Sequence, residues 1–192
     1  ETAFEPEDLY DFEKRTFNKI KKQTLFYSCE PKIDGVAVSL IYEKGKFIKA
    51  GTRGDGEQGE DITHNVKTIK QIPLVLNGKN HPDKIEIRGE IYCEKTAFDK
   101  FNKEYAKSGQ KTFANPRNFV AGSIRQLNPE IAAARPLKIQ LHSLGYVDQK
   151  NFFKSHQEML NTFLSWNLPI NPDIELVNSI AVSYTHLRAH ET

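Results

Sequence analysis

The heptapeptide CEPKIDG, residues 29–35, gathers a lysine, two carboxylates and a glycine in one short stretch. If the stretch is extended, successive side chains alternate between two faces, so Glu30, Lys32 and Asp34 share one face. The lysine then has two interpretations. It is a nucleophile that attacks a phosphate, or it is one charge of a salt-bridged strand at the surface. The heptapeptide alone favours the surface strand, because short motifs often arise by chance.

The neighbours of Lys32 bear on the nucleophile hypothesis in opposite directions. Pro31 cannot donate to a sheet, which predicts a strand edge or a bulge that a cleft can reach. Gly35 permits a tight turn or the close approach of a ligand to the backbone. However, a nucleophilic lysine must first lose its proton, and the two adjacent carboxylates favour the charged amine. The hypothesis therefore requires a metal ion or further lysines.

A glycine-rich stretch, GTRGDGEQG at residues 51–59, contains the G-x-G-x-x-G spacing of dinucleotide-binding turns. Its acidic neighbours would repel a pyrophosphate, and the preceding strand resembles a hairpin arm rather than a buried parallel strand. We therefore predict a mobile loop that carries Arg53 and Asp55 on alternate positions. Arg53 is a candidate donor to a phosphate or a ribose.

The stretch KIEIRGEIY, residues 84–92, alternates apolar and polar side chains and predicts a strand. Arg88 and Glu90 lie on its polar face. Glu90 has the chemistry to accept hydrogen bonds from ribose hydroxyls, and a cross-strand ion pair is the alternative.

The stretch FANPRNFVAGSIRQLNP, residues 113–129, predicts a short helix with Asn115 as its cap and Pro116 in its first turn. This start places Arg117 and Arg125 near a helix N-terminus, which is a ready anion site. An ordinary surface role is the alternative for both arginines.

Charge is unevenly distributed along the chain, although the net charge is only +2. Residues 1–20 are acidic, whereas residues 99–140 contain few acids. The basic side chains of the second segment are Lys100, Lys103, Lys107, Lys111, Arg117, Arg125, Arg135 and Lys138. Such a segment suits a phosphate backbone, but a solvated helix face explains it equally well.

Periodicity predicts the elements that position these residues, in an α+β domain with antiparallel sheets. The expected helices and strands are an amphipathic helix at 5–22, a hairpin of strands 36–42 and 46–51, a strand at 84–92, a helix at 96–109 opened by a Thr96 capping box, the helix after Asn115, a strand at 137–147 and a helix at 152–166.

Composition limits the class of protein further. The chain has 192 residues, which suits one domain with at most a small appendage. Cys29 and Cys93 have no zinc-ligand spacing and are typical of small buried residues. No metal site is predicted, because the spacing of the histidines does not match that of metal ligands. The histidines considered are His64, His81, His142 and His156. No apolar run approaches the ~18 residues of a membrane span, which predicts a cytoplasmic protein without membrane contact.

The four blocks CEPKIDG, TRGDGEQGEDITHNVKTIKQIPL, EIRGEIY and FANPRNFVAGSIRQLNP resemble, in this order, the adenylation domain of bacterial NAD-dependent DNA ligases. The resemblance covers about residues 2–181. It implies an ATP-grasp-like nucleotidyltransferase domain with antiparallel sheets and flanking helices, in which residues 1–24 form a leading helix and residues 25–181 the core.

The resemblance also implies a reaction. Lys32 attacks the α-phosphate of NAD, releases nicotinamide mononucleotide and forms lysyl-AMP, with magnesium stabilising charge. The AMP then activates the 5′-phosphate of a nick in double-stranded DNA, and the 3′-hydroxyl seals the strand. The implied protein is a monomeric, nucleoid-associated enzyme of DNA replication and repair.

Roles follow by matching motifs. Glu30 reads the adenine, Arg53 and Glu90 hold the ribose region, and Asp34 supports the site. Arg117 and Arg125 handle phosphates of the nucleotide or of the nicked DNA. Gly35 and Arg88 belong to the same matched motifs.

Several parts of the family pattern are missing from the sequence, which predicts a fragment truncated at its C-terminus that is inactive alone. The missing parts are the segment that binds nicotinamide mononucleotide, a DGVVIK-like motif with a following lysine motif, and the other ligase domains with their zinc site. Residues 182–192, VSYTHLRAHET, resemble a translated sequencing adapter, although a genuine tail is the alternative. Under the adapter interpretation His186 and His190 have no function.

Two other functions compete with this one. An ATP-using nucleotidyltransferase of the same superfamily would share the lysine motif but not the TRGDG and FANPRN blocks. A non-catalytic DNA-binding module would use the basic segment, but it has no need of Lys32.

Overall fold

The computed structural model describes residues 3, 5–20, 25–54 and 59–180. The chain divides into two compact units. The first comprises Glu1–Lys32 with Asn171–Thr192, and the second comprises Ile33–Ile170. The C-terminal stretch 182–192 lies outside the described residues.

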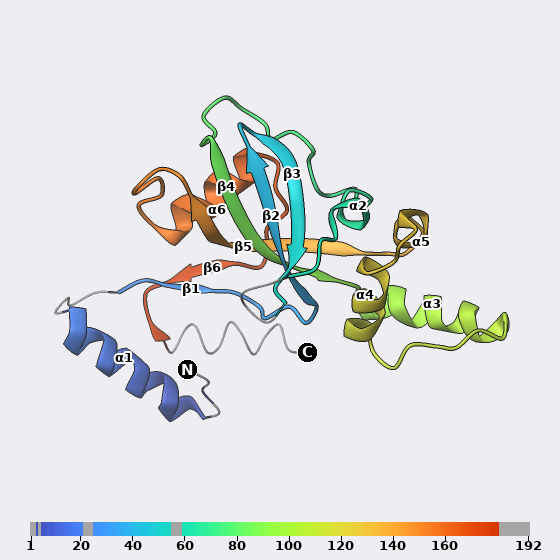
Figure 1. The fold of residues 1–192 in the computed structure, drawn as a ribbon. Helices are drawn as coiled ribbons and strands as arrows, with labels where there is room; N and C mark the ends of the chain where they lie inside the picture. The colour runs from blue at the N-terminus through green and yellow to red at the C-terminus, as the bar shows by residue number, and fades with distance from the viewer. Residues whose placement is uncertain (1–2, 4, 21–24, 55–58, 181–192) are drawn as a thin grey trace. The chain divides into compact units, whose positions relative to one another are not determined.

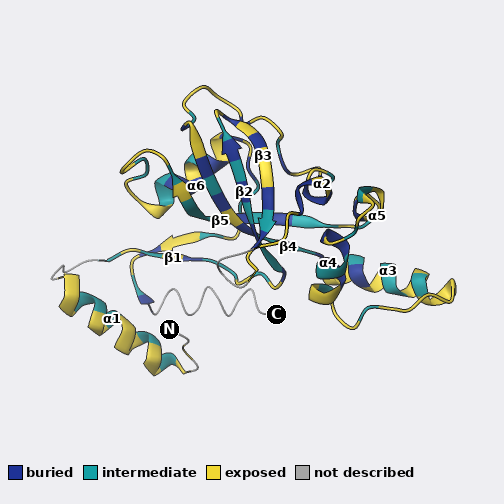
Figure 2. Ribbon diagram, viewed as in Figure 1, coloured by how far each residue is buried: buried dark blue, intermediate teal, exposed yellow. Residues whose placement is uncertain are grey.

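The first unit contains helix α1 (Pro6–Ile20) and a two-stranded antiparallel sheet of β1 (Tyr27–Cys29) and β6 (Glu175–Val177). The helix predicted at 5–22 is confirmed. It has no buried residue, as Figure 2 shows by its exposed and intermediate colours. The Tyr27 hydroxyl donates to Glu13 at 3.0 Å and thereby connects β1 to α1.

The second unit is built on a four-stranded antiparallel sheet in the order β3-β2-β4-β5 (Figure 1). Its strands are β2 (Val36–Glu43), β3 (Lys46–Thr52), β4 (Lys84–Tyr92) and β5 (Lys138–Val147). All four were predicted, and the antiparallel arrangement is confirmed. The β2–β3 turn has positive φ at both Lys44 (49°) and Gly45 (75°), the geometry that suits the twist of a two-residue hairpin.

Alternation along β4 decides which face of the sheet is buried. Ile85, Ile87 and Ile91 are at most 1% exposed, whereas Glu86 and Arg88 on the opposite face are not buried. Figure 2 shows the same alternation along the central strands. The apolar face packs with neighbouring helices into a core that contains Leu40, Tyr42, Phe119, Val120, Ile124, Ile139, Leu141, Leu160 and Phe163. Burial of this face is the main stabilising contribution to the unit.

Helices surround the sheet. Their bounds are α2 (Thr63–Val66), α3 (Lys95–Lys107), α4 (Pro116–Ile124), α5 (Pro129–Ala133) and α6 (His156–Ser165). Helix α4 contacts β2 and β4, α2 contacts β3, and α6 contacts β5. The short α2 and α5 were not predicted, because each is too short to show a helical period.

The predicted helix starts have mixed outcomes. The side chain of Asn115 accepts from the N–H of Asn118 at 2.7 Å, so the predicted cap of α4 is confirmed. The predicted Thr96 cap of α3 is wrong, because the helix already begins at Lys95 and Glu94 holds the extended cap position. The Glu94 carboxylate is instead engaged by Lys138. Helix α6 begins later than predicted, after a Ser155 cap.

The outer edge of β3 is covered by returning chain. The N–H of Phe47 donates to the carbonyl of Leu74 at 2.9 Å, and that of Thr52 donates to the carbonyl of Glu60 at 3.0 Å. Because edge strands expose backbone groups that invite pairing, these contacts satisfy part of the edge within the chain. Among the described residues, no helix is both long and apolar enough to cross a membrane.

Candidate active site

The CEPKIDG stretch is a strand only at its start. β1 ends at Cys29, where pairing with Glu175 stops, and residues 30–34 have no regular secondary structure. Pro31 has no N–H to continue the ladder, which explains this end. Lys32 and Asp34 are exposed and Ile33 between them is half-buried, but Glu30 is half-buried like Pro31, so burial follows the predicted alternation only over residues 32–34.

The ion pairs of this stretch differ from the surface-strand interpretation. Lys32 is exposed and forms no ion pair with any described residue. The Ser28 hydroxyl donates to Glu30 at 2.9 Å. In the second unit, Asp34 accepts from Arg117 Nη1 at 3.3 Å. The ion-pair partner of Asp34 is therefore Arg117 at the start of α4, which is 83 residues away in the sequence.

Gly35 meets β4 closely. A Cβ atom at this position would overlap the carbonyl oxygen of Ile91 and lie 3.2 Å from Cγ of Glu90. The glycine therefore permits a close approach, but the approaching group is the chain's own β4 backbone and not a ligand. The contact brings Gly35 beside Glu90, which is half-buried on the polar face of the strand.

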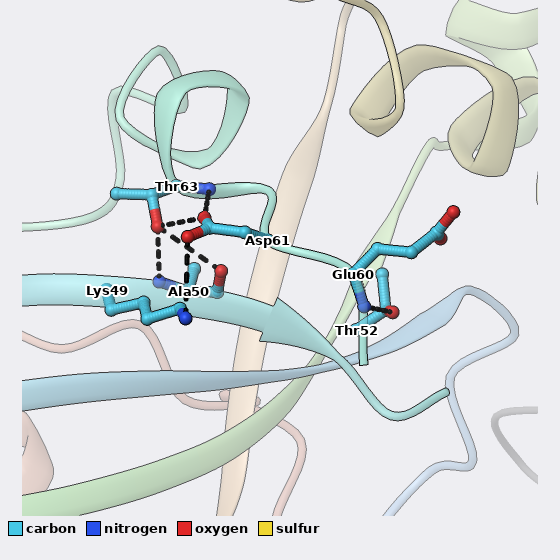
Figure 3. Close-up of polar contacts among 6 residues, drawn as sticks. All are labelled: Lys49, Ala50, Thr52, Glu60, Asp61 and Thr63. Carbon is cyan, nitrogen blue, oxygen red and sulfur yellow. Dashed lines mark hydrogen bonds and ion pairs between the residues drawn. The ribbon is translucent and has the colours of Figure 1, made fainter. Parts of the chain in front are cut away.

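Arg53 directly follows β3. Its N–H donates to the carbonyl of Ala37 at 3.3 Å, and its side chain is exposed. The predicted companion Asp55 lies outside the described residues, as do residues 56–58 of the loop predicted to be mobile. The two ends of that loop are joined by two hydrogen bonds, from the Thr52 N–H to the Glu60 carbonyl and from the Glu60 N–H to the Thr52 hydroxyl; Figure 3 shows the second.

Arg88 is engaged along its own strand. Its Nε donates to Glu86 Oε1 at 3.0 Å, and the Ser39 hydroxyl donates to the same oxygen at 2.8 Å. The ion pair on this face therefore joins Arg88 to Glu86, one pleat away, and not to Glu90. Arg88 therefore helps to hold the Glu86 side chain in place on the polar face of the sheet.

The two arginines of the fourth block lie at opposite ends of α4. Arg117 is the second residue of the helix, as predicted. The prediction that Arg125 also lies near this N-terminus is wrong, because α4 continues to Ile124 and Arg125 is its C-cap. Burial of Val120 and Ile124 accounts for the unbroken helix. The Arg125 guanidinium instead donates to the carboxylate of Glu60 at the end of the glycine-rich loop.

Arg135 was counted only as one charge of the basic segment, yet it has a distinct environment. Its guanidinium carbon lies 5.8, 5.2 and 5.3 Å from the ring centres of Phe101, Phe113 and Phe119. Its Nη1 also donates to the Ser123 hydroxyl at 2.7 Å. Cation–π attraction therefore ties the end of α5 to α3 and α4. The aromatic spacing around residues 98–119 was the available clue.

The cysteines and the possible metal ligands do not form a reactive site among the described residues. Both cysteines are buried, as predicted, and burial raises the pKa of Cys93 to about 11. This shift disfavours the reactive thiolate. Among the described residues, no group of three or more His, Cys, Asp or Glu side chains is placed to hold a metal ion.

Within the second unit, the end of the first block, Asp34 and Gly35, meets residues of the third and fourth blocks, whereas Glu30 and Lys32 belong to the first unit. Gly35 contacts β4, Asp34 pairs with Arg117, and Glu60 pairs with Arg125. Exposed arginines paired with carboxylates at the two ends of α4 suit a phosphorylated ligand.

Comparison with known proteins identifies the family. The family model for the NAD-dependent DNA ligase adenylation domain matches residues 1–190. The chain belongs to this family. The resemblance read from the four blocks is thereby confirmed.

Curated relatives of the adenylation-domain family give the same result. A DNA ligase of Hahella chejuensis is 46% identical over 93% of this chain, and one of Coxiella burnetii is 45% identical over 94%. A DNA ligase of Methylococcus capsulatus is 41% identical over 98% of the chain. The chain spans 26%, 27% and 28% of the length of these relatives, respectively.

Proposed function

We propose that this chain forms the adenylate-accepting part of an NAD-dependent DNA ligase, with Lys32 as its nucleophile. The meeting of the blocks carries the proposal. Asp34 follows Lys32 by two residues and pairs with Arg117, and Gly35 packs beside Glu90. An ordinary surface lysine would not require distant blocks to contact Asp34 and Gly35, the residues that closely follow it in the chain.

The proposed first step transfers AMP to the lysine. The Lys32 amine, after losing its proton, attacks the α-phosphorus of NAD, and a phosphorus–nitrogen bond forms. The bond between that phosphorus and the bridging pyrophosphate oxygen breaks, and nicotinamide mononucleotide leaves with the electron pair. The 5′-phosphate of a nick then takes the AMP from the lysine, and the 3′-hydroxyl displaces AMP as the phosphodiester forms.

The exposed groups divide into nucleotide and DNA contacts. In this proposal Glu30 reads the adenine, Arg53 and Glu90 hold the ribose region, and Asp34 supports the site as the partner of Arg117 until a phosphate binds. Arg117 and Arg125 then receive phosphates, since guanidinium groups match phosphate oxygens in pairs.

Magnesium fits this chain as an ion carried by substrate phosphates. Mg²⁺ commonly binds through phosphates, water and one or two carboxylates, and it does not need a large protein cage. Asp34 is an exposed carboxylate beside the proposed site and suits that role. When bound, magnesium supplies charge stabilisation at the phosphates. A zinc site forms no part of the chemistry proposed for this chain.

The proposal extends to the setting of the reaction. The antiparallel α+β core supports an ATP-grasp-like nucleotidyltransferase domain, and nicked double-stranded DNA is the proposed partner. A monomeric enzyme of replication and repair in the bacterial cytoplasm, associated with the nucleoid, fits these roles.

Labelling with NAD tests the proposal. The full-length protein, incubated with magnesium and NAD labelled in its AMP part, is expected to gain one AMP on Lys32. Lys32→Ala should abolish the label, and Lys79→Ala, at another exposed lysine, should keep it. Labelling by ATP but not by NAD would instead favour the ATP-using alternative. Unchanged labelling of Lys32→Ala would refute the proposed nucleophile.

We further propose that the 192-residue chain is inactive or weakly active by itself, because its relatives are about four times longer. Weak labelling is the expected result. Labelling as strong as that of the full-length protein would contradict this part.

A further inference from the structure

The chain returns from the glycine-rich loop along the edge of β3 (Figure 3). The N–H of Thr52 donates to the carbonyl of Glu60, and the N–H of Glu60 donates to the Thr52 hydroxyl, both at 3.0 Å. Two residues later, the N–H of Ile62 donates to the carbonyl of Ala50 at 3.0 Å. The loop thus starts and ends at one hydrogen-bonded pair of residues.

Thr63 completes this pairing from a buried position. Its hydroxyl accepts from the N–H of Ala50 at 3.0 Å and donates to Asp61 Oδ1 at 2.6 Å. The same carboxylate oxygen accepts from the N–H of Thr63 at 2.9 Å, and Lys49 Nζ lies 3.5 Å from Oδ2. The Thr63 hydroxyl therefore adds a buried side-chain link between the edge of β3 and the segment that closes the loop, as Figure 3 shows.

The hydrogen bonds between Asp61 and Thr63 form with a charged Asp61 carboxylate at neutral pH. Hydrogen bonds from the Thr63 hydroxyl and N–H, with a smaller contribution from the charge of Lys49, lower the pKa of Asp61. The carboxylate is therefore charged and acts as a strong acceptor. Removing the Thr63 hydroxyl would also leave the N–H of Ala50 without this partner.

Arg53 depends on this base more than the other candidate arginines do. It is the first residue after Thr52, and its backbone is held to β2 by one 3.3 Å hydrogen bond. Among the described residues its guanidinium has no ion-pair partner, whereas Arg117 and Arg125 each have a carboxylate. The backbone at the loop base, and not a side-chain partner, decides where Arg53 stands.

We propose that Thr63 and Asp61 are positioning residues that hold the base of the glycine-rich loop so that Arg53 is placed for the nucleotide. This inference rests on the proposed function, in which Arg53 contacts the ribose region. It adds two residues that act through the backbone of β3 at Ala50, two residues before Thr52.

Kinetics of lysyl-AMP formation in the full-length protein test the inference. Thr63→Val keeps the side-chain shape and removes the hydroxyl, and we expect it to raise the KM for NAD about tenfold. Thr63→Ser restores the hydroxyl and should return KM to within about twofold of the wild-type value. Thr68→Val is the matched control, because its hydroxyl donates to the carbonyl of Asn65 at 2.7 Å and makes no contact with the loop base. It should leave KM unchanged.

A double variant separates positioning from general destabilisation. If Thr63 acts through Arg53, Thr63→Val adds nothing to the defect of Arg53→Ala. Multiplied defects in the double variant would overturn the inference, and so would a wild-type KM for Thr63→Val. If Thr63→Val fails to fold, as thermal unfolding would reveal, Asp61→Asn replaces it with an expected KM increase of about threefold.

The Lys32→Ala protein distinguishes failure of the positioning role from failure of the proposed function. If it is unlabelled while Thr63→Val behaves as wild type, only the positioning role is refuted. If Lys32→Ala is labelled normally, the proposed function is refuted and the positioning role with it.

Discussion

Arg117 and Arg125 differ sharply from Arg135, although all three belong to one basic segment. The first two stand at the ends of α4, each paired with a single carboxylate, and their side chains are 60% and 52% exposed. Arg135 instead lies over three phenylalanine rings and donates to the buried Ser123. Equal charge in the sequence has therefore led to two kinds of environment.

The energetics of the two environments explain their different uses. Exposed ion pairs contribute about 0–1 kcal/mol, so a phosphate can replace the carboxylate partner of Arg117 or Arg125 at little cost. A desolvated cation–π contact contributes about 2 kcal/mol or more. We infer that Arg135 stabilises the fold, whereas Arg117 and Arg125 are available to ligands.

The largest expected effect concerns stability. Arg135→Met keeps an apolar stem between the rings but removes the cation and the bond to Ser123, so we expect the free energy of unfolding to fall by about 3 kcal/mol. Urea denaturation of the 192-residue chain measures it. Arg117→Met is the matched control, with an expected change below about 0.5 kcal/mol. Equal losses of stability in both variants would contradict the inference that Arg135 stabilises the fold more than Arg117 does.

The next effect concerns DNA. Arg117→Ala in the full-length protein should weaken binding to nicked DNA about tenfold, because one charge-assisted phosphate contact is lost. Binding measured over a range of salt concentrations should show a slope reduced by about one. The exposed Lys79, replaced by alanine, serves as the control. Unaltered affinity and slope in Arg117→Ala would remove it from the DNA contacts.

A smaller effect is expected at the other end of α4. Glu60→Gln removes the carboxylate that competes with phosphate for Arg125, so affinity for nicked DNA should rise about twofold to threefold. Stability should change by less than about 0.5 kcal/mol, since the ion pair is exposed. A loss of affinity would show that Glu60 instead holds Arg125 in its binding position.

The smallest effect is a pH dependence at the loop base. The pKa of Asp61 is lowered from its ordinary value near 3.8, chiefly by hydrogen bonds from Thr63. The stabilisation it provides is therefore present above that ordinary value and lost as pH falls through the lowered pKa. Urea denaturation at a series of acidic pH values should show a shallower decline in Asp61→Asn than in the wild type. Identical profiles would contradict this assignment.

Local patterns in the sequence predicted most of the regular elements. Alternation over residues 84–92 predicted β4 with its isoleucines buried, and Asn115 with Pro116 predicted the start of α4. These features depend on spacing of two or about 3.6 residues and on short-range capping, which nearby residues decide. The order of the four blocks was likewise enough to indicate the family.

Only the tertiary structure decided how the pieces meet. Asp34 and Arg117 are 83 residues apart, and β1 pairs with β6 from the far end of the chain. The sequence placed Arg125 at the wrong end of its helix and did not distinguish Arg135 from its basic neighbours. A side chain's type states which partners it can accept. Which partner it obtains depends on long-range packing of the sheet and helices, and periodicity along the chain contains no record of that packing.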